Sequence, residues 1–240
     1  MLGRGRYKEY IYWATTFLWA ALALLFFGVL MKSFGYDATK MWIYSPQDGN
    51  LRGLLCGFAA YLIFMLFLIL PKFRHNLTWF MHFTHELTHT LVALFFFRRI
   101  EEFVVSGRDC HVKYQKSHIG YVPITLSPYC IPIYTFMLFP FRYFGAKDYM
   151  FAFDLMIAFT YAFHLHSFFR YTRFSQSDIE GVGLTRSTAF ISFMHLSVLA
   201  LILAMPNGGM RKAIYRVFWE YPIQLLSDPS SWWKDAFMYF

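Results

Sequence analysis

The stretch LTWFMHFTHELTHTLVALFFF, residues Leu77–Phe97, decides the fold class of this chain. It contains no Lys or Arg, and it is as long as the roughly 20 helical residues that cross the hydrocarbon core of a bilayer. Other stretches of similar length and composition are Tyr10–Met31, Gly53–Leu70, Ile119–Phe141, Tyr149–Phe169 and Ser187–Met205. The sequence therefore predicts an all-α polytopic membrane protein with about six transmembrane helices.

The composition excludes a soluble globular domain. Of the 240 residues, 58% are hydrophobic and only 15% are charged, whereas about a quarter of a typical soluble domain is charged. The formal net charge is +8, but the basic residues flank the apolar stretches, where they meet lipid headgroups. We therefore expect the lipid bilayer, and no nucleic acid, as a partner. Three cysteines without CxxC spacing predict neither a disulfide framework nor a thiolate metal site.

The chain divides into parts of one membrane domain, residues 1–240. Residues 1–76 are expected to form two N-terminal transmembrane helices, residues 77–205 the core, and residues 206–240 an interfacial tail. The fourth apolar stretch carries Pro123, Pro128, Pro132 and Pro140, and each proline removes a backbone donor. This pattern predicts a broken or re-entrant segment. The β-branched residues and the polar turn of Arg98–His118 predict a short β-hairpin at the membrane surface.

The motif His85-Glu86-Leu87-Thr88-His89 lies inside the opening stretch. In a helix, His85 and His89 lie one turn apart on one face, so both imidazoles can reach the same zinc ion. Glu86 lies beside them, where it can take a proton from a zinc-bound water and pass it to a leaving amine. Two His and one Glu within an apolar helix cost insertion energy, which favours a zinc site over a structural polar cluster.

The chain resembles the site-2 protease family of intramembrane zinc metalloproteases over roughly Leu77–Met205. The resemblance rests on the His85–Thr90 motif in a membrane helix, the predicted hairpin, the segment Leu126-Ser127-Pro128-Tyr129 and a later acidic residue. It implies one Zn²⁺ held by two His and a distant Asp, a Glu as general base, and a cytoplasmic hairpin. The Leu-Asp-Gly motif of the best-known branch is absent, and Ser177-Asp178-Ile179-Glu180-Gly181 is its nearest match.

The third metal ligand is predicted to be Asp178, because a catalytic zinc needs three protein ligands. Asp178 precedes the sixth apolar stretch, on the side where the His85–His89 helix ends. The alternatives are that Asp178 is an N-cap residue, or that Asp154 or His164 is the ligand. A structural pair, for instance with a His, is the default prediction for Asp154. His82 and His166 are further candidates, as second-shell partners or alternative ligands.

The sequence thus predicts a zinc-dependent intramembrane endopeptidase, a multi-pass protein of the bacterial inner membrane that cleaves membrane proteins. Its loops are too short for a recognition domain, so a separate substrate-presenting partner remains open. One alternative is a non-catalytic member that binds membrane proteins. Another is a membrane di-iron desaturase or hydroxylase, although such enzymes need several His boxes. In the predicted topology, Arg98–His118 and Arg170–Arg186 are cytoplasmic and the N-terminus is external.

Overall fold

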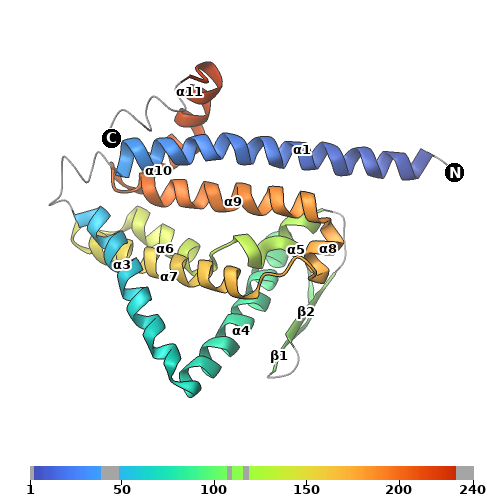
Figure 1. Ribbon diagram of the computed structural model, residues 1–240, viewed down its shortest axis with the longest axis horizontal. Helices are drawn as coiled ribbons and strands as arrows, with labels where there is room; N and C mark the ends of the chain where they lie inside the picture. Colours follow the sequence, from blue (N-terminus) through green and yellow to red (C-terminus); the bar gives the residue numbers. More distant parts are fainter. Residues whose placement is uncertain (1–2, 39–48, 107–109, 116–118, 231–240) are drawn as a thin grey trace.

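The computed structural model describes residues 3–38, 49–106, 110–115 and 119–230, and it is mostly helical (Figure 1). Its longer helices are α1 (Gly3–Lys32), α3 (Gly49–Leu66), α4 (Pro71–Phe95), α5 (Tyr121–Cys130), α6 (Ile133–Phe144), α7 (Met150–Tyr171) and α9 (Leu184–Ala204). The shorter elements are η1 (Ser33–Ala38), η2 (Phe67–Ile69), η3 (Lys147–Tyr149), α8 (Ser177–Val182), α10 (Gly209–Tyr215), η4 (Arg216–Glu220) and α11 (Tyr221–Ser227). Two strands, β1 (Ile100–Val105) and β2 (Cys110–Tyr114), complete the described part.

Three helices in the described ranges are long and apolar enough to cross a membrane: Lys8–Gly35, Leu51–Ile69 and Leu184–Ala204. The pair α5 and α6, bent by 86°, would make a fourth if it forms one span. These helices support a membrane protein, but they do not confirm six spans. Helices α4 and α7 are long enough, yet polar side chains in their interiors, such as Glu86 in α4 and Asp154 and His164 in α7, make them less apolar.

Helices α1 and α9 lie side by side and run in the same direction (Figure 1). Successive contacts along both helices are Tyr12 with Arg186, Trp19 with Phe190, and Phe26 with Phe193. If both helices cross the membrane, an odd number of crossings must lie between them, so they cannot be the first and last of six alternating spans. Under the same condition the N-terminal end of α1 lies on the side of the Arg170–Arg186 segment, since Tyr12 contacts Arg186, and not on the opposite side as the predicted topology requires.

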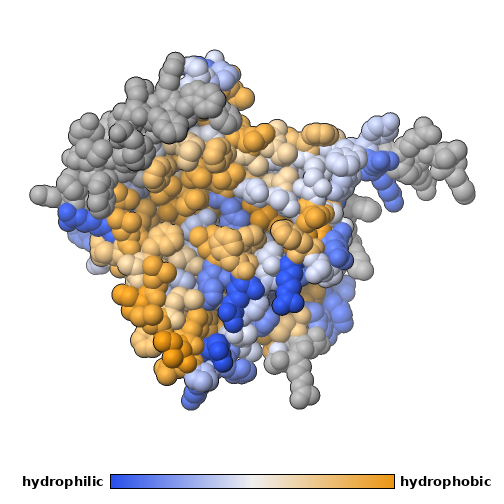
Figure 2. All heavy atoms as spheres, viewed as in Figure 1, coloured by the Kyte–Doolittle hydropathy of each residue, from blue (hydrophilic) through white to orange (hydrophobic). Residues whose placement is uncertain are grey.

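Helix α3 packs along α7, and α4 leaves the end of α3 at an angle, so that the two helices form a V (Figure 1). Glycines permit the close α3–α7 contact: a Cβ atom at Gly57 would lie only 2.2 Å from the carbonyl oxygen of Leu155. Hydrophobic side chains cover α3 on the face drawn in Figure 2, and hydrophilic ones gather toward α4 and the hairpin. The V therefore carries α4 away from the apolar surface and toward the polar one.

The predicted break in the fourth apolar stretch is confirmed. Helix α5 ends at Cys130 and α6 begins at Ile133, with Pro132 between them. The predicted hairpin is confirmed as well, since β1 and β2 pair antiparallel from Ile100 opposite Tyr114 to Val105 opposite Cys110. Its turn and residues 116–118 lie outside the described residues.

The largest core cluster lies among α1, α7, α9 and the tail. It includes Phe26, Tyr161, Leu201 and Met205, which are buried. Met210, Ala213, Val217, Tyr221 and Leu225 of the tail belong to the same cluster. The described tail thus packs on the helical core through its apolar side chains. Residues 231–240 of the predicted interfacial tail lie outside the described part.

Candidate metal centre

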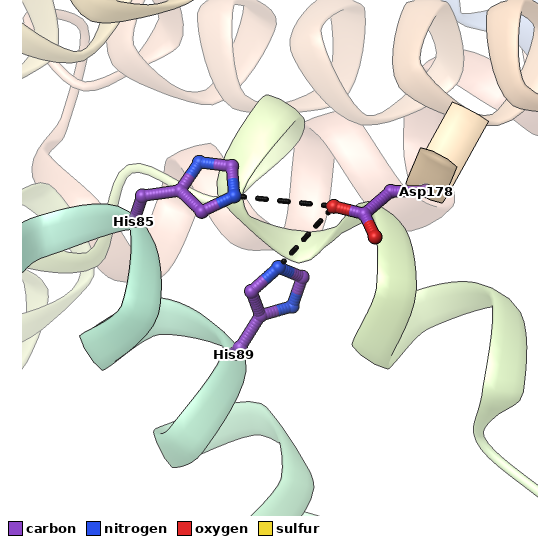
Figure 3. Close-up of side chains that lie close together, drawn as sticks. All are labelled: His85, His89 and Asp178. Carbon is purple, nitrogen blue, oxygen red and sulfur yellow. Dashed lines mark ion pairs between the residues drawn. The ribbon is translucent and has the colours of Figure 1, made fainter. Parts of the chain in front are cut away.

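Two imidazoles of α4 and one carboxylate of α8 converge on one point (Figure 3). His85 and His89 lie one helical turn apart, with ring centres separated by 5.0 Å. The Oδ2 atom of Asp178 lies 3.9 Å from Nε2 of His85 and 3.5 Å from Nε2 of His89. The structure therefore brings together the three residues predicted from the sequence as metal ligands.

The three groups fit a metal ion by separation and by chemistry. One ligand atom from each residue can be chosen so that all lie within 4.8 Å of one another. In a tetrahedral zinc site with bonds of about 2.0–2.2 Å, neighbouring ligand atoms lie about 3.4 Å apart. The separations of Oδ2 of Asp178 from the two Nε2 atoms, 3.5 and 3.9 Å, are close to that value. The group could therefore hold a metal ion, although its geometry does not single out zinc.

Asp178 is suited to bind a cation at neutral pH. Burial raises the pKa of its carboxyl, but the neighbouring side chains of His89 and Tyr129 outweigh that effect and hold the pKa below its ordinary value. The Tyr129 hydroxyl donates a hydrogen bond of 3.0 Å to Oδ2 of Asp178. The carboxylate is thus ionised, and Tyr129 fixes its direction.

The orientation of His89 depends on a proline in α5. An α-helical carbonyl normally accepts from the N–H four residues later, but Pro128 has no N–H to offer Ile124. Nδ1 of His89 lies 2.8 Å from the free carbonyl oxygen of Ile124 and donates to it. This bond places a hydrogen on Nδ1, so the neutral ring that a metal requires has its lone pair on Nε2, the nitrogen that faces Asp178.

Packing of α8 against α5 places Asp178. Ile179 and Val182 are each only 1% exposed, and they share a cluster with Leu126 and Tyr129. The N-cap residue of α8 is Gln176, so the alternative interpretation of Asp178 as the N-cap is wrong. In the sequence Tyr129 stands out only as part of a Pro-rich segment. Its role as the partner of Asp178 depends on how α5 meets α8, for which the sequence holds no periodic signal.

Glu86 lies next to His85 on α4 and is 8% exposed. It lines a cavity of about 500 Å³ between α4, the hairpin and the segment that joins α7 to α8. His82, Tyr171 and Gln176 also line this cavity, and the ring of His82 lies 5.2 Å from that of Tyr171. Glu86 and His85 thus border a cavity that is large enough for water, and most of its lining residues carry polar side chains.

Two alternative candidates lie in other environments. Asp154 accepts a hydrogen bond of 2.6 Å from Nε of Arg142, and both side chains are buried. The predicted structural pair for Asp154 is therefore present, but its partner is an Arg and not a His. His166 lies 2.7 Å from the hydroxyl of Tyr61. The structure brings neither Asp154 nor His166 into the metal-binding group.

His164 is buried, with its ring centre 5.4 Å from that of His195. It does not belong to the group of possible ligand atoms around Asp178. It does share the wall of a small cavity with His85. His164 is therefore a neighbour of one ligand and not a member of the described ligand set.

Comparison with known proteins identified no relative of this chain. No protein-family model, no curated protein and no solved structure matches the chain.

Proposed function

We propose that this protein is a zinc-dependent endopeptidase that hydrolyses peptide bonds of membrane proteins within or near the bilayer. The observation that carries the proposal is the convergence of Asp178 on His85 and His89, with Glu86 beside them. Two His from a His-Glu-x-x-His helix and one distant carboxylate are a donor set of catalytic zinc. The resemblance to site-2 proteases supports the same reading.

In the proposed reaction, the chain's own groups handle the proton and hold the ligands. Zinc, when bound, polarises the scissile carbonyl and lowers the pKa of a bound water toward neutrality. Glu86 accepts one proton of the attacking water as the hydroxyl group joins the carbonyl carbon. It then returns that proton to the amide nitrogen as the C–N bond breaks, so the products are a carboxyl group and an amine. Ile124 and Tyr129 hold His89 and Asp178 in their orientations.

The proposed substrates are membrane proteins because the same chain carries apolar helices and a polar cavity. The cavity beside Glu86 opens between α4 and the hairpin, while Leu51–Ile69 and Leu184–Ala204 are apolar enough to lie in lipid. A substrate segment that leaves the bilayer could enter the cavity in extended form. A separate protein that presents the substrate is compatible with this arrangement.

Metal analysis combined with one isosteric variant tests the proposal. Purified protein should hold one zinc, and Glu86→Gln should keep that zinc but lose proteolysis of a membrane-protein substrate, since the amide cannot accept a proton. Glu101→Gln is the matched control, because Glu101 is exposed on β1. Wild-type cleavage by Glu86→Gln would overturn the role of Glu86. Protein without metal would instead favour a non-catalytic binding role, and two irons would favour oxidative chemistry.

A further inference from the structure

The two histidines of the metal centre differ in how their second ring nitrogen is held. Nδ1 of His89 donates to the carbonyl of Ile124. In the described part of the chain no protein group bonds to Nδ1 of His85, whose side chain is 26% exposed and whose Nε2 faces Asp178. Metal-binding histidines almost always donate their second N–H to a carboxylate, a carbonyl or a water, and this bond fixes the ring. His85 therefore lacks a partner that a ligand normally has.

A small cavity lies beside His85 on the side of α7. Its volume is about 20 Å³, and it is lined by His85, His164, Thr84, Ser167 and the prolines of the α5–α6 break. A cavity needs about 10–15 Å³ of this kind of volume, and two to four polar partners, to hold a water molecule. The imidazoles and hydroxyls in the wall meet the second requirement. The cavity is therefore the size of one water and polar enough to keep it.

His164 is a buried side chain, and one of its ring nitrogens has no partner among the residues that the structure describes. Its side chain is 7% exposed, and its Nε2 has no hydrogen-bond partner in the part of the chain described. The same is true of Nδ1 of the neighbouring His195. Nε2 of His195 lies 2.9 Å from the carbonyl oxygen of Tyr129. A carbonyl only accepts, so Nε2 of His195 carries the hydrogen and its Nδ1 is left as an acceptor.

Buried polar atoms without partners are uncommon and call for an explanation. We propose that a water in the small cavity bridges Nδ1–H of His85 and the imidazole of His164, which makes His164 a positioning residue for the metal ligand His85. The ring of His195, anchored on the carbonyl of Tyr129, packs 5.4 Å from that of His164. The inference rests on the proposed zinc site. It adds to that site two histidines that do not bind the metal, His164 of α7 and His195 of α9.

Zinc affinity is the measurement that tests this role. The probe is Zn²⁺ itself, titrated against a chelator in the purified full-length protein. His164→Leu removes the partner of the water and should weaken zinc binding about 10- to 100-fold, the usual effect of losing an outer-shell partner. His164→Gln, whose amide can bond the same water, should recover most of that loss. His166→Leu is the matched control: it removes an imidazole from the same helix, but one that pairs with Tyr61, and it should leave zinc affinity unchanged.

The outcomes separate this inference from the proposed function. Wild-type zinc affinity in a folded His164→Leu variant would overturn the inference and leave the zinc site intact. Complete loss of zinc in both His164→Leu and His164→Gln would make His164 a ligand, which also overturns it. A wild-type protein that binds no zinc would overturn the proposed function itself. If His164→Leu does not fold, a structure of the zinc-loaded wild type decides: a water between His85 and His164 supports the bridge, and an empty cavity contradicts it.

Discussion

At the scale of single residues, we expect replacement of Asp178 to have the largest effect on zinc binding and proteolysis. Its carboxylate is the one proposed ligand that comes from outside α4, so Asp178→Ala should weaken zinc binding by more than the roughly 100-fold that loss of a partner behind a ligand costs, and it should abolish proteolysis. Glu180→Ala is the control, because Glu180 lies exposed on the same short helix. Chelator competition measures both affinities. Equal zinc affinity of the two variants would remove Asp178 from the ligand set.

The buried Asp154–Arg142 pair should matter for stability and not for metal. Asp154→Leu leaves the guanidinium of Arg142 buried without its carboxylate, and breaking such a pair typically costs about 3–5 kcal/mol. Adding Arg142→Met should restore most of that loss, because the charge is then gone as well. Thermal unfolding in detergent measures stability, and zinc content should stay at the wild-type level in the double variant. Loss of zinc there would return Asp154 to the list of candidate ligands.

How far the site could be predicted also differs from residue to residue. The spacing of His85 and His89 predicts a shared face because helical geometry alone fixes it. Asp178 followed from its position in the chain and from resemblance, and the structure places it beside both imidazoles. Tyr129 and the carbonyl of Ile124 could not be predicted, since both contacts depend on the packing of α5 against α4 and α8. The sequence does not identify the partner of Asp154, because Arg142 lies just outside the apolar stretch Ile119–Phe141 and the pairing depends on how α6 packs against α7.

At the scale of elements, the proline-rich segment does more than break a helix. Pro128 frees the carbonyl of Ile124, which accepts from His89 and from the Ser127 hydroxyl. A carbonyl oxygen has two lone pairs, so a third donor must compete with these two. The prolines predicted the break, but which carbonyl the break would expose, and to which side chain, depends on tertiary packing.

Pro128→Ala supplies that third donor and should therefore disturb the metal centre, although residue 128 is not itself a proposed ligand. The new N–H at residue 128 can bond to Ile124 in the helical pattern and weaken the bond from Nδ1 of His89. We expect zinc affinity to fall about 10-fold or more, as for loss of an outer-shell partner. Pro140→Ala is the control, because Pro140 also lies inside a helix, α6, but lines neither cavity at the metal site. Unchanged affinity in Pro128→Ala would show that His89 does not need this carbonyl.

At the scale of the whole molecule, the parallel packing of α1 and α9 constrains the topology. Counting apolar stretches gives six alternating spans, in which the first and the last are antiparallel. The aromatic contacts between α1 and α9 instead advance together along both helices, from Trp19 with Phe190 to Phe26 with Phe193. Hydropathy alone cannot detect this, because the direction of a span depends on whether each preceding segment crosses or turns back. The bent pair α5 and α6 is one segment that can turn back.

Cysteine labelling tests the sidedness that this packing implies. In a background without Cys56, Cys110 and Cys130, single cysteines replace Lys8 near the start of α1, Ser175 before α9 and Arg211 after α9, all of which are exposed. Because Tyr12 lies against Arg186, Lys8→Cys and Ser175→Cys should react on the same side of the membrane. Arg211→Cys should react on the other side, since α9 lies between it and Ser175. If the loop before α9 is cytoplasmic, as the resemblance implies, an impermeant reagent in intact cells labels only Arg211→Cys. Labelling of Lys8→Cys and Ser175→Cys from opposite sides would mean that α1 and α9 do not cross as a parallel pair. Such a result would agree with six alternating spans.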